Sequence, residues 1–120
     1  MAEGVLFVSW GQPVAGREER GLEVFNEALG FYGKCQQDGR IESFDVVLLE
    51  PNADMNGYIE LRGSVEQLND LREDDEYRRI LVEASLVCDK MRVLAGATGA
   101  RIAREVTMYQ DVLSHVPQTT

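Results

Sequence analysis

Three polar side chains recur at every second position of one short segment, and they are the residues best placed to do chemistry. Tyr58, Glu60 and Arg62 alternate with Ile59 and Leu61. Strict alternation predicts a strand with one apolar and one polar face. An acid and an arginine in a mostly apolar space should pair, because an unpaired buried charge is very costly. Glu60 is the candidate general acid or base, and Tyr58 and Arg62 are candidate pocket-lining residues.

Three further segments can bring side chains to the same face. Arg92 joins it if the residues on either side of Arg92 face the helices. Asp45 is a further candidate because of its parity within the second strand. Ser9 and Trp10 end the first strand on opposite parities, so only one of them can face inward, and we take Trp10 as pocket-lining. Two interpretations stay open for this set: a structural salt bridge at a dimer interface, or a polar anchor in a small-molecule pocket.

The other reactive side chains form no recognisable site. His115 is the only histidine and lies near the C-terminus, where the sequence implies neither a partner nor a pocket. The acidic run 73–76 fits a helix N-terminus better than a metal site. Thr98 is expected to be the N-cap of the last helix rather than part of an anion loop. Cys35 and Cys88 lack a CxxC companion and are expected to be reduced, buried thiols. We expect no metal and no cofactor.

The composition is that of one soluble globular domain, over residues 1–120. Of the 120 residues 44% are hydrophobic and 28% are charged, and the formal net charge is −9. Twelve basic residues scattered among 21 acidic ones do not make the basic patch that nucleic acid or an anionic membrane surface requires. No targeting signal or membrane span is visible, which predicts a cytoplasmic protein.

The apolar periodicity predicts an α+β protein. Residues 87–95 fit either an extension of the preceding helix or a strand, and we predict a strand, because three strands alone would leave an unpaired edge. Ser64 and Gln67 fit a capping box, and Gly39 suits the left-handed position after the first helix. The predicted elements are a strand over 5–10, a helix over 17–37, strands over 41–50 and 58–62, a two-piece helix from 64, a strand within 87–95 and a helix from 98 to about 116. This order is the ferredoxin-like βαββαβ arrangement with an added C-terminal helix, in which both main helices cover one face of a four-stranded antiparallel sheet.

Both faces of that sheet carry apolar side chains. The first strand has Val5 and Phe7 on one parity and Leu6 and Val8 on the other, and the second strand shows the same pattern. An antiparallel sheet covered on one face should be polar on the other in a monomer. The simplest solution is a second copy packed sheet to sheet, so we expect a two-fold homodimer.

The chain resembles the dimeric alpha-beta barrel superfamily, and in particular its small uncharacterised bacterial members. The resemblance extends over nearly the whole chain and is carried by residues 4–11, 39–44, 48–51, 74–77 and 98–99. The resemblance implies a ferredoxin-like protomer and a dimer. The superfamily includes cofactor-free monooxygenases, isomerases, haem proteins and members with no known role. Haem-binding relatives use a core histidine and others an early histidine–aspartate dyad, and this chain matches neither.

Two classes of function follow. The first is a homodimer that binds a small apolar or aromatic molecule, between sheet and helices or between the two sheets, with cofactor-free monooxygenase or isomerase chemistry as its enzymatic form. The second is a non-catalytic dimeric accessory or structural protein with a filled interior. A pocket of several hundred cubic ångströms in each subunit favours the first class.

Overall fold

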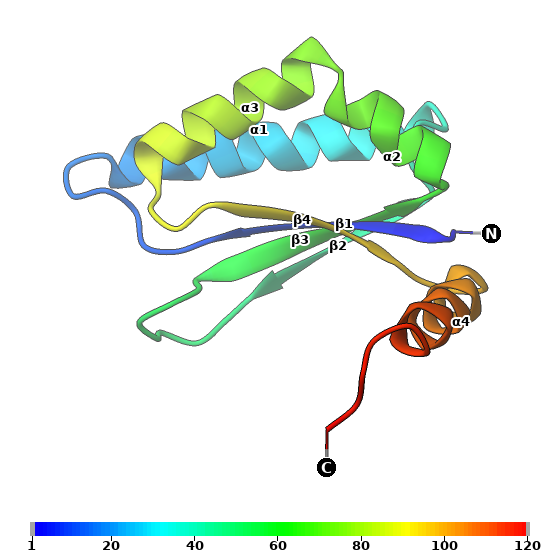
Figure 1. Cartoon of the computed structure of the whole chain (residues 1–120). Coiled ribbons are helices and arrows are strands. Elements are labelled where there is room, and N and C mark those ends of the chain that lie inside the picture. The colour runs from blue at the N-terminus through cyan, green and yellow to red at the C-terminus, as the bar shows by residue number, and fades with distance from the viewer. Residues whose placement is uncertain (1, 120) are drawn as a thin grey trace.

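A computed structural model describes residues 2–119 of the chain (Figure 1). Four strands and four helices follow one another in the predicted order. Their bounds are β1 (Gly4–Trp10), α1 (Glu18–Gln37), β2 (Ser43–Leu48), β3 (Gly57–Gly63), α2 (Val65–Arg72), α3 (Asp75–Val87), β4 (Arg92–Ala97) and α4 (Arg101–Leu113).

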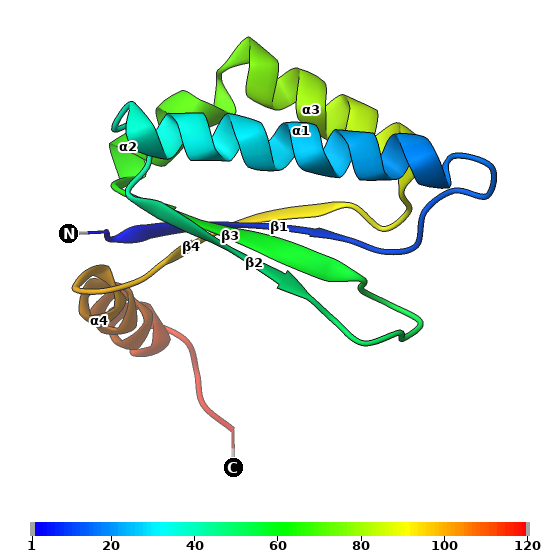
Figure 2. The same ribbon diagram turned by 180° about the vertical axis from the view of Figure 1, so that it is seen from behind.

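The strands form one antiparallel sheet in the order β2-β3-β1-β4. In the central pair, Leu6 of β1 lies opposite Leu61 of β3, and Phe7 lies opposite Glu60. Figures 1 and 2 show α1, α2 and α3 on one side of the sheet and α4 on the other side. The predicted ferredoxin-like fold is therefore confirmed, and so is the choice of a fourth strand over a longer helix.

The core lies between the sheet and the α1–α3 layer. Side chains of one strand parity, such as Leu6, Leu61 and Ile59, are buried there. Helix residues recurring at three- and four-residue spacing meet them from above: Val24, Ala28, Phe31, Tyr32 and Cys35 of α1, Leu68 and Leu71 of α2, and Tyr77 and Ile80 of α3. Burial of these two apolar surfaces drives the layers together.

Local signals set the helix ends. The Ser64 hydroxyl accepts from the Gln67 N–H at 3.0 Å, and the Gln67 side chain accepts from the Ser64 N–H at 2.8 Å, which is the predicted capping box. Gly39 has a φ of 75°, a conformation that costs a glycine little, and it follows the end of α1. Asp74 caps α3, because its carboxylate accepts from the Tyr77 N–H at 3.0 Å.

Several predicted boundaries were wrong: β4 continues to Ala97 instead of ending by residue 95, and α4 ends at Leu113 instead of near 116. The strand predicted over 41–50 spans only Ser43–Leu48, because the Leu49 N–H donates to the Asn56 carbonyl and the chain turns there. Thr98 does not cap α4, whose N-cap is Ala100. Gly99, with a φ of 59°, turns the chain after Thr98, and the Thr98 hydroxyl instead accepts from Arg62 at 3.5 Å.

We predict that Asp74→Ala lowers the free energy of unfolding by about 1 kcal/mol at pH 7, the usual value of an N-cap. The Tyr77 N–H, together with the Arg40 guanidinium 2.8 Å away, lowers the pKa of the Asp74 carboxyl. A lowered folded-state pKa contributes stability above the ordinary carboxyl pKa, and this stability is lost as the pH falls through the folded value. Urea unfolding at pH 7 and pH 3 should show the difference from wild type shrinking in acid. Asp75→Ala, one residue into the helix and exposed, is the control, and an equal effect of both variants would contradict the assignment of the cap.

Candidate functional site

A cavity of about 600 Å³ lies between the helix layer and the sheet. Its floor comes from β1 and β3, its walls from α1 and α3, and its rim from the loops after β1 and β2. The lining residues are Val8, Trp10, Gln12, Pro13, Glu18, Gly21, Leu22, Val24, Phe25, Ala28, Tyr32, Leu48, Leu49, Pro51, Asn56, Ile59, Ile80, Leu81, Ala84, Val87, Cys88 and Met91. Most of these side chains are hydrocarbon, so the cavity is apolar.

Small residues on the helix faces leave this space open. Gly21 and Ala28 of α1 and Ala84 of α3 all line the cavity. Larger side chains at these positions would have met the sheet and filled the layer, as Phe31 does one turn further along α1. The space is therefore a result of side-chain size at positions that face the sheet.

Trp10 is the only tryptophan of the chain, and it lies at the rim of the cavity. Its ring is 5.6 Å from that of Phe25, measured between centroids, in a tilted arrangement that aromatic pairs favour. Gly57 allows this position, because a Cβ atom there would lie 2.9 Å from the Trp10 ring and 2.6 Å from the Val47 carbonyl. Trp10 and Phe25 thus present aromatic surface to the cavity.

The polar groups of the lining gather near the loops at the Trp10 end. The Gln12 amide donates to the Asn56 side chain at 3.0 Å and to the Asn52 carbonyl at 3.1 Å. The Asn56 N–H donates to the Trp10 carbonyl at 2.8 Å. The Gln12 N–H donates in turn to the Asp89 carboxylate at 2.6 Å. These bonds hold together the two loops that form the rim.

The interior of the cavity is electrically neutral at physiological pH. Burial raises the pKa of the Tyr32 hydroxyl and of the Cys88 thiol, so both stay protonated. Glu18, the one charged residue of the lining, is exposed at the start of α1. A neutral ligand would therefore enter this space at lower cost than a charged one.

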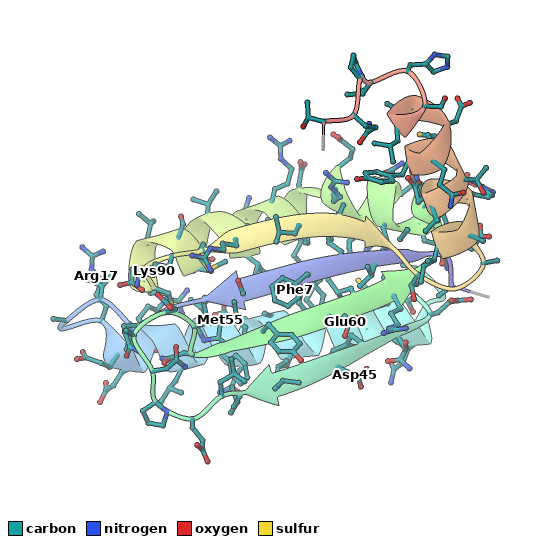
Figure 3. All side chains as sticks on the ribbon, turned by 60° about the horizontal axis from the view of Figure 1, so that its bottom comes forward. Phe7, Arg17, Asp45, Met55, Glu60 and Lys90 are labelled. Carbon is teal, nitrogen blue, oxygen red and sulfur yellow. The ribbon has the colours of Figure 1, made fainter. Side chains whose placement is uncertain are left out.

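The outer face of the sheet carries five of the six side chains singled out in the sequence. Glu60 lies opposite Asp45 and Phe7, and Arg62 donates to the Glu60 carboxylate at 3.0 Å. Tyr58 packs against Phe7 with ring centroids 4.9 Å apart. Arg92 lies across from Ser9 on the same face. Figure 3 views this face, with Phe7, Glu60 and Asp45 turned toward the reader.

The structure divides the six residues between two sites. Trp10 lines the cavity, whereas Tyr58, Glu60, Arg62, Arg92 and Asp45 lie on the opposite side of the sheet. Alternation was enough to group the residues of β2, β3 and β4, but the choice of Trp10 over Ser9 for the Tyr58 face was wrong, because Ser9 is the one that lies opposite Tyr58. Alternation did not reveal the cavity, because nothing in the sequence states how far the helix layer stands from the sheet. The small residues Gly21, Ala28 and Ala84 at sheet-facing positions were the one available signal.

Within residues 2–119, no group of three or more His, Cys, Asp or Glu side chains gathers closely enough to hold a metal ion. The acidic run 73–76 instead supplies the N-cap and first turn of α3. Over the same range, no helix has both the length and the apolar character that a membrane crossing needs.

Comparison with known proteins finds similarity in structure but not in sequence. No family model and no curated protein matches the chain. A conserved protein from Methanosarcina mazei Go1 aligns with a TM-score of 0.63 and 12% identity, over 81% of this chain and 94% of its own. The hydroxynitrile lyase from Passiflora edulis aligns with a TM-score of 0.60 and 14% identity, over 82% and 95%. A dimeric protein of unknown function and ferredoxin-like fold from Bacteroides fragilis NCTC 9343 aligns with a TM-score of 0.54 and 13% identity, over 79% of this chain and 96% of its own.

These similarities define the class of protein by its protomer fold. The chain has the ferredoxin-like fold, which the resemblance to the dimeric alpha-beta barrel superfamily implied. Similar structures include an enzyme and a protein of unknown function, so the fold alone does not assign an activity.

We predict that filling the cavity stabilises the protein. Ala84→Leu should raise the free energy of unfolding by about 1 kcal/mol, because the added methylene groups enter empty apolar space rather than a packed core. Ala103→Leu, the same change at an exposed position of α4, is the matched control and should have little effect. Urea unfolding followed by circular dichroism measures both variants. Destabilisation by Ala84→Leu with a neutral control would mean that the space is closed in solution.

Proposed function

We propose that this protein is a homodimer in which each protomer binds one small, uncharged apolar or aromatic molecule between α1, α3 and the sheet. The observation that carries the proposal is the apolar cavity of about 600 Å³. Binding sites for small molecules are typically concave, mostly apolar and about 300–1,000 Å³ in volume. The space in one protomer falls within that range.

The lining favours a flat, neutral ligand. Trp10 and Phe25 offer ring faces, and the protonated Tyr32 hydroxyl is a hydrogen-bond donor among hydrocarbon walls. Exposed apolar side chains at the rim, Leu22 and Leu48, give an apolar molecule a path into the cavity. A charged ligand would lose its hydration there without gaining a buried counter-charge.

The outer face of the sheet is the support for the proposed homodimer. Val5, Phe7 and Val47 remain partly exposed on that face, and Leu94 is exposed. Ser9 also belongs to this face, and its buried hydroxyl has no hydrogen-bond partner within residues 2–119. A second copy packed on this face would cover these apolar side chains.

Cofactor-free monooxygenase or isomerase chemistry is the enzymatic form of this proposal, and a role for Glu60 as an acid or base stays a prediction. Glu60 lies across the sheet from the cavity, so it would act on a molecule held between the two sheets of the dimer. The alternative is a non-catalytic accessory dimer. The ion pair between Glu60 and Arg62 favours that alternative for the outer face, because it already satisfies both charges.

Titration with N-phenyl-1-naphthylamine, a neutral aromatic dye, tests the cavity. Trp10 lies at the rim and should transfer excitation energy to a bound dye, so dye emission on tryptophan excitation should rise and saturate at one dye per protomer. Ala84→Phe places a ring inside the cavity and should weaken dye binding about tenfold or more, which corresponds to about 1.4 kcal/mol. Ala103→Phe on the exposed side of α4 should bind the dye like wild type. Equal affinities in all three proteins would overturn the assignment of the cavity.

Glu60→Gln separates the two faces of the sheet. It removes the charge but keeps the shape of the side chain, so dye affinity in the cavity should stay within about twofold of wild type, since the site lies on the other face. The ion pair with Arg62 is lost in this variant. A large loss of dye binding in a folded Glu60→Gln protein would place the ligand between the sheets instead.

A further inference from the structure

The C-terminal helix α4 is amphipathic but buries none of its residues. Its apolar side chains recur at four-, three- and four-residue spacing, at Ile102, Val106, Tyr109 and Leu113, and therefore form one row. Ile102 is 50% exposed, Val106 49% and Tyr109 68%. Such a row on a helix is expected to pack against another surface, because removing apolar side chains from water is favourable.

A second uncovered apolar surface of the protomer lies on the same side. Figures 1 and 2 show α4 on the side of the sheet away from α1 and α3, at the end of the sheet where β1 begins and β4 ends. The outer face bearing Phe7 and Leu94 points to that side too. Only residues 98–100 connect β4 to α4, so the helix stays at this end and does not cover the face of its own sheet.

Charge distinguishes these two surfaces from the rest of the molecule. On the outer face, Arg62 and Arg92 balance Asp45 and Glu60, which are all the charged residues of the four strands. On α4, Arg101 and Arg104 balance Glu105 and Asp111. The formal net charge of −9 therefore lies entirely outside both surfaces.

This distribution favours a second copy of the chain over other occupants. Two copies of a protein with charge −9 repel each other, and contact through locally neutral surfaces adds least to that repulsion. An amphipathic helix that binds anionic lipid needs an excess of Lys and Arg on its polar face, and α4 is balanced. The outer face of the sheet and the apolar row of α4 are both neutral and lie on one side of the protomer. They are therefore suited to a two-fold contact in which both surfaces pack against the second copy.

We propose that α4 is a dimerisation arm, whose row of Ile102, Val106, Tyr109 and Leu113 packs against the second copy at the end of the layer between the two sheets. This inference rests on the proposed homodimer and adds to it the element that closes the interface. Each dimer would bury two such rows, one from each protomer.

Analytical ultracentrifugation of the full-length chain tests the arm. The double variant Ile102→Gln, Val106→Gln keeps good helix formers and adds no charge. Four apolar side chains lose their contacts in the dimer, so its dissociation constant should rise about 100-fold or more. The matched control is Val82→Gln, Leu86→Gln on α3, whose side chains are 59% and 57% exposed on the other side of the molecule. The control should dimerise like wild type, and both variants should keep the dye affinity and circular dichroism of wild type.

Three other outcomes would overturn the proposal in distinguishable ways. A wild-type protein that sediments as a monomer at 100 µM would overturn the dimer and the arm together. A wild-type dimer that Phe7→Gln weakens and the α4 variant does not would keep the dimer and reject the arm. Binding of the wild type to phosphatidylcholine vesicles, lost in the α4 variant with no change in dimerisation, would make a lipid surface the occupant of α4.

Discussion

The pairing of β1 with β3 is the constraint on which the rest of the structure depends. Leu6 and Leu61 lie opposite each other at the centre of the sheet and are buried under the helices. Because side chains alternate between the faces, this one register also directs Val8 and Ile59 toward the cavity and Phe7 and Glu60 to the outer face. A slip by one residue would move every side chain of the shifted strand to the opposite face. The same contact therefore positions the core, the floor of the cavity and the polar side chains of the outer face.

The helix layer is held to the sheet at two ends and is less completely filled between them. At one end Phe31, Tyr32 and Leu71 pack closely on the sheet, and at the other end hydrogen bonds of the loops around Gln12 and Asn56 brace the rim. A protein selected for stability alone would gain by filling such a space with larger side chains. A space left open in an apolar layer lowers stability but leaves room for a ligand. For this reason the proposed function is assigned to the cavity.

The outer face and α4 present the opposite situation, because they are apolar surfaces without a cover. Their charges cancel within each surface, while the acidic residues of the chain are spread over the helices and loops. An acidic exterior keeps such a protein soluble, and neutral apolar patches allow association where they match. The ion pair between Glu60 and Arg62 fits this arrangement, since it places two charges on the face without a net charge.

The sequence by itself determined the order of the elements, the capping box at Ser64 and the alternation of residues within each strand, since these depend on spacing and on contacts between near neighbours. It also separated Ser9 from Trp10 by parity, without showing which space each one enters. The tertiary structure alone decided that Gly21, Ala28 and Ala84 leave a cavity, that Gly99 moves the start of α4 past Thr98, and that α4 stands clear of its own sheet. These features depend on the distance between layers and the direction of a short connection, and many residues far apart in the sequence fix both together.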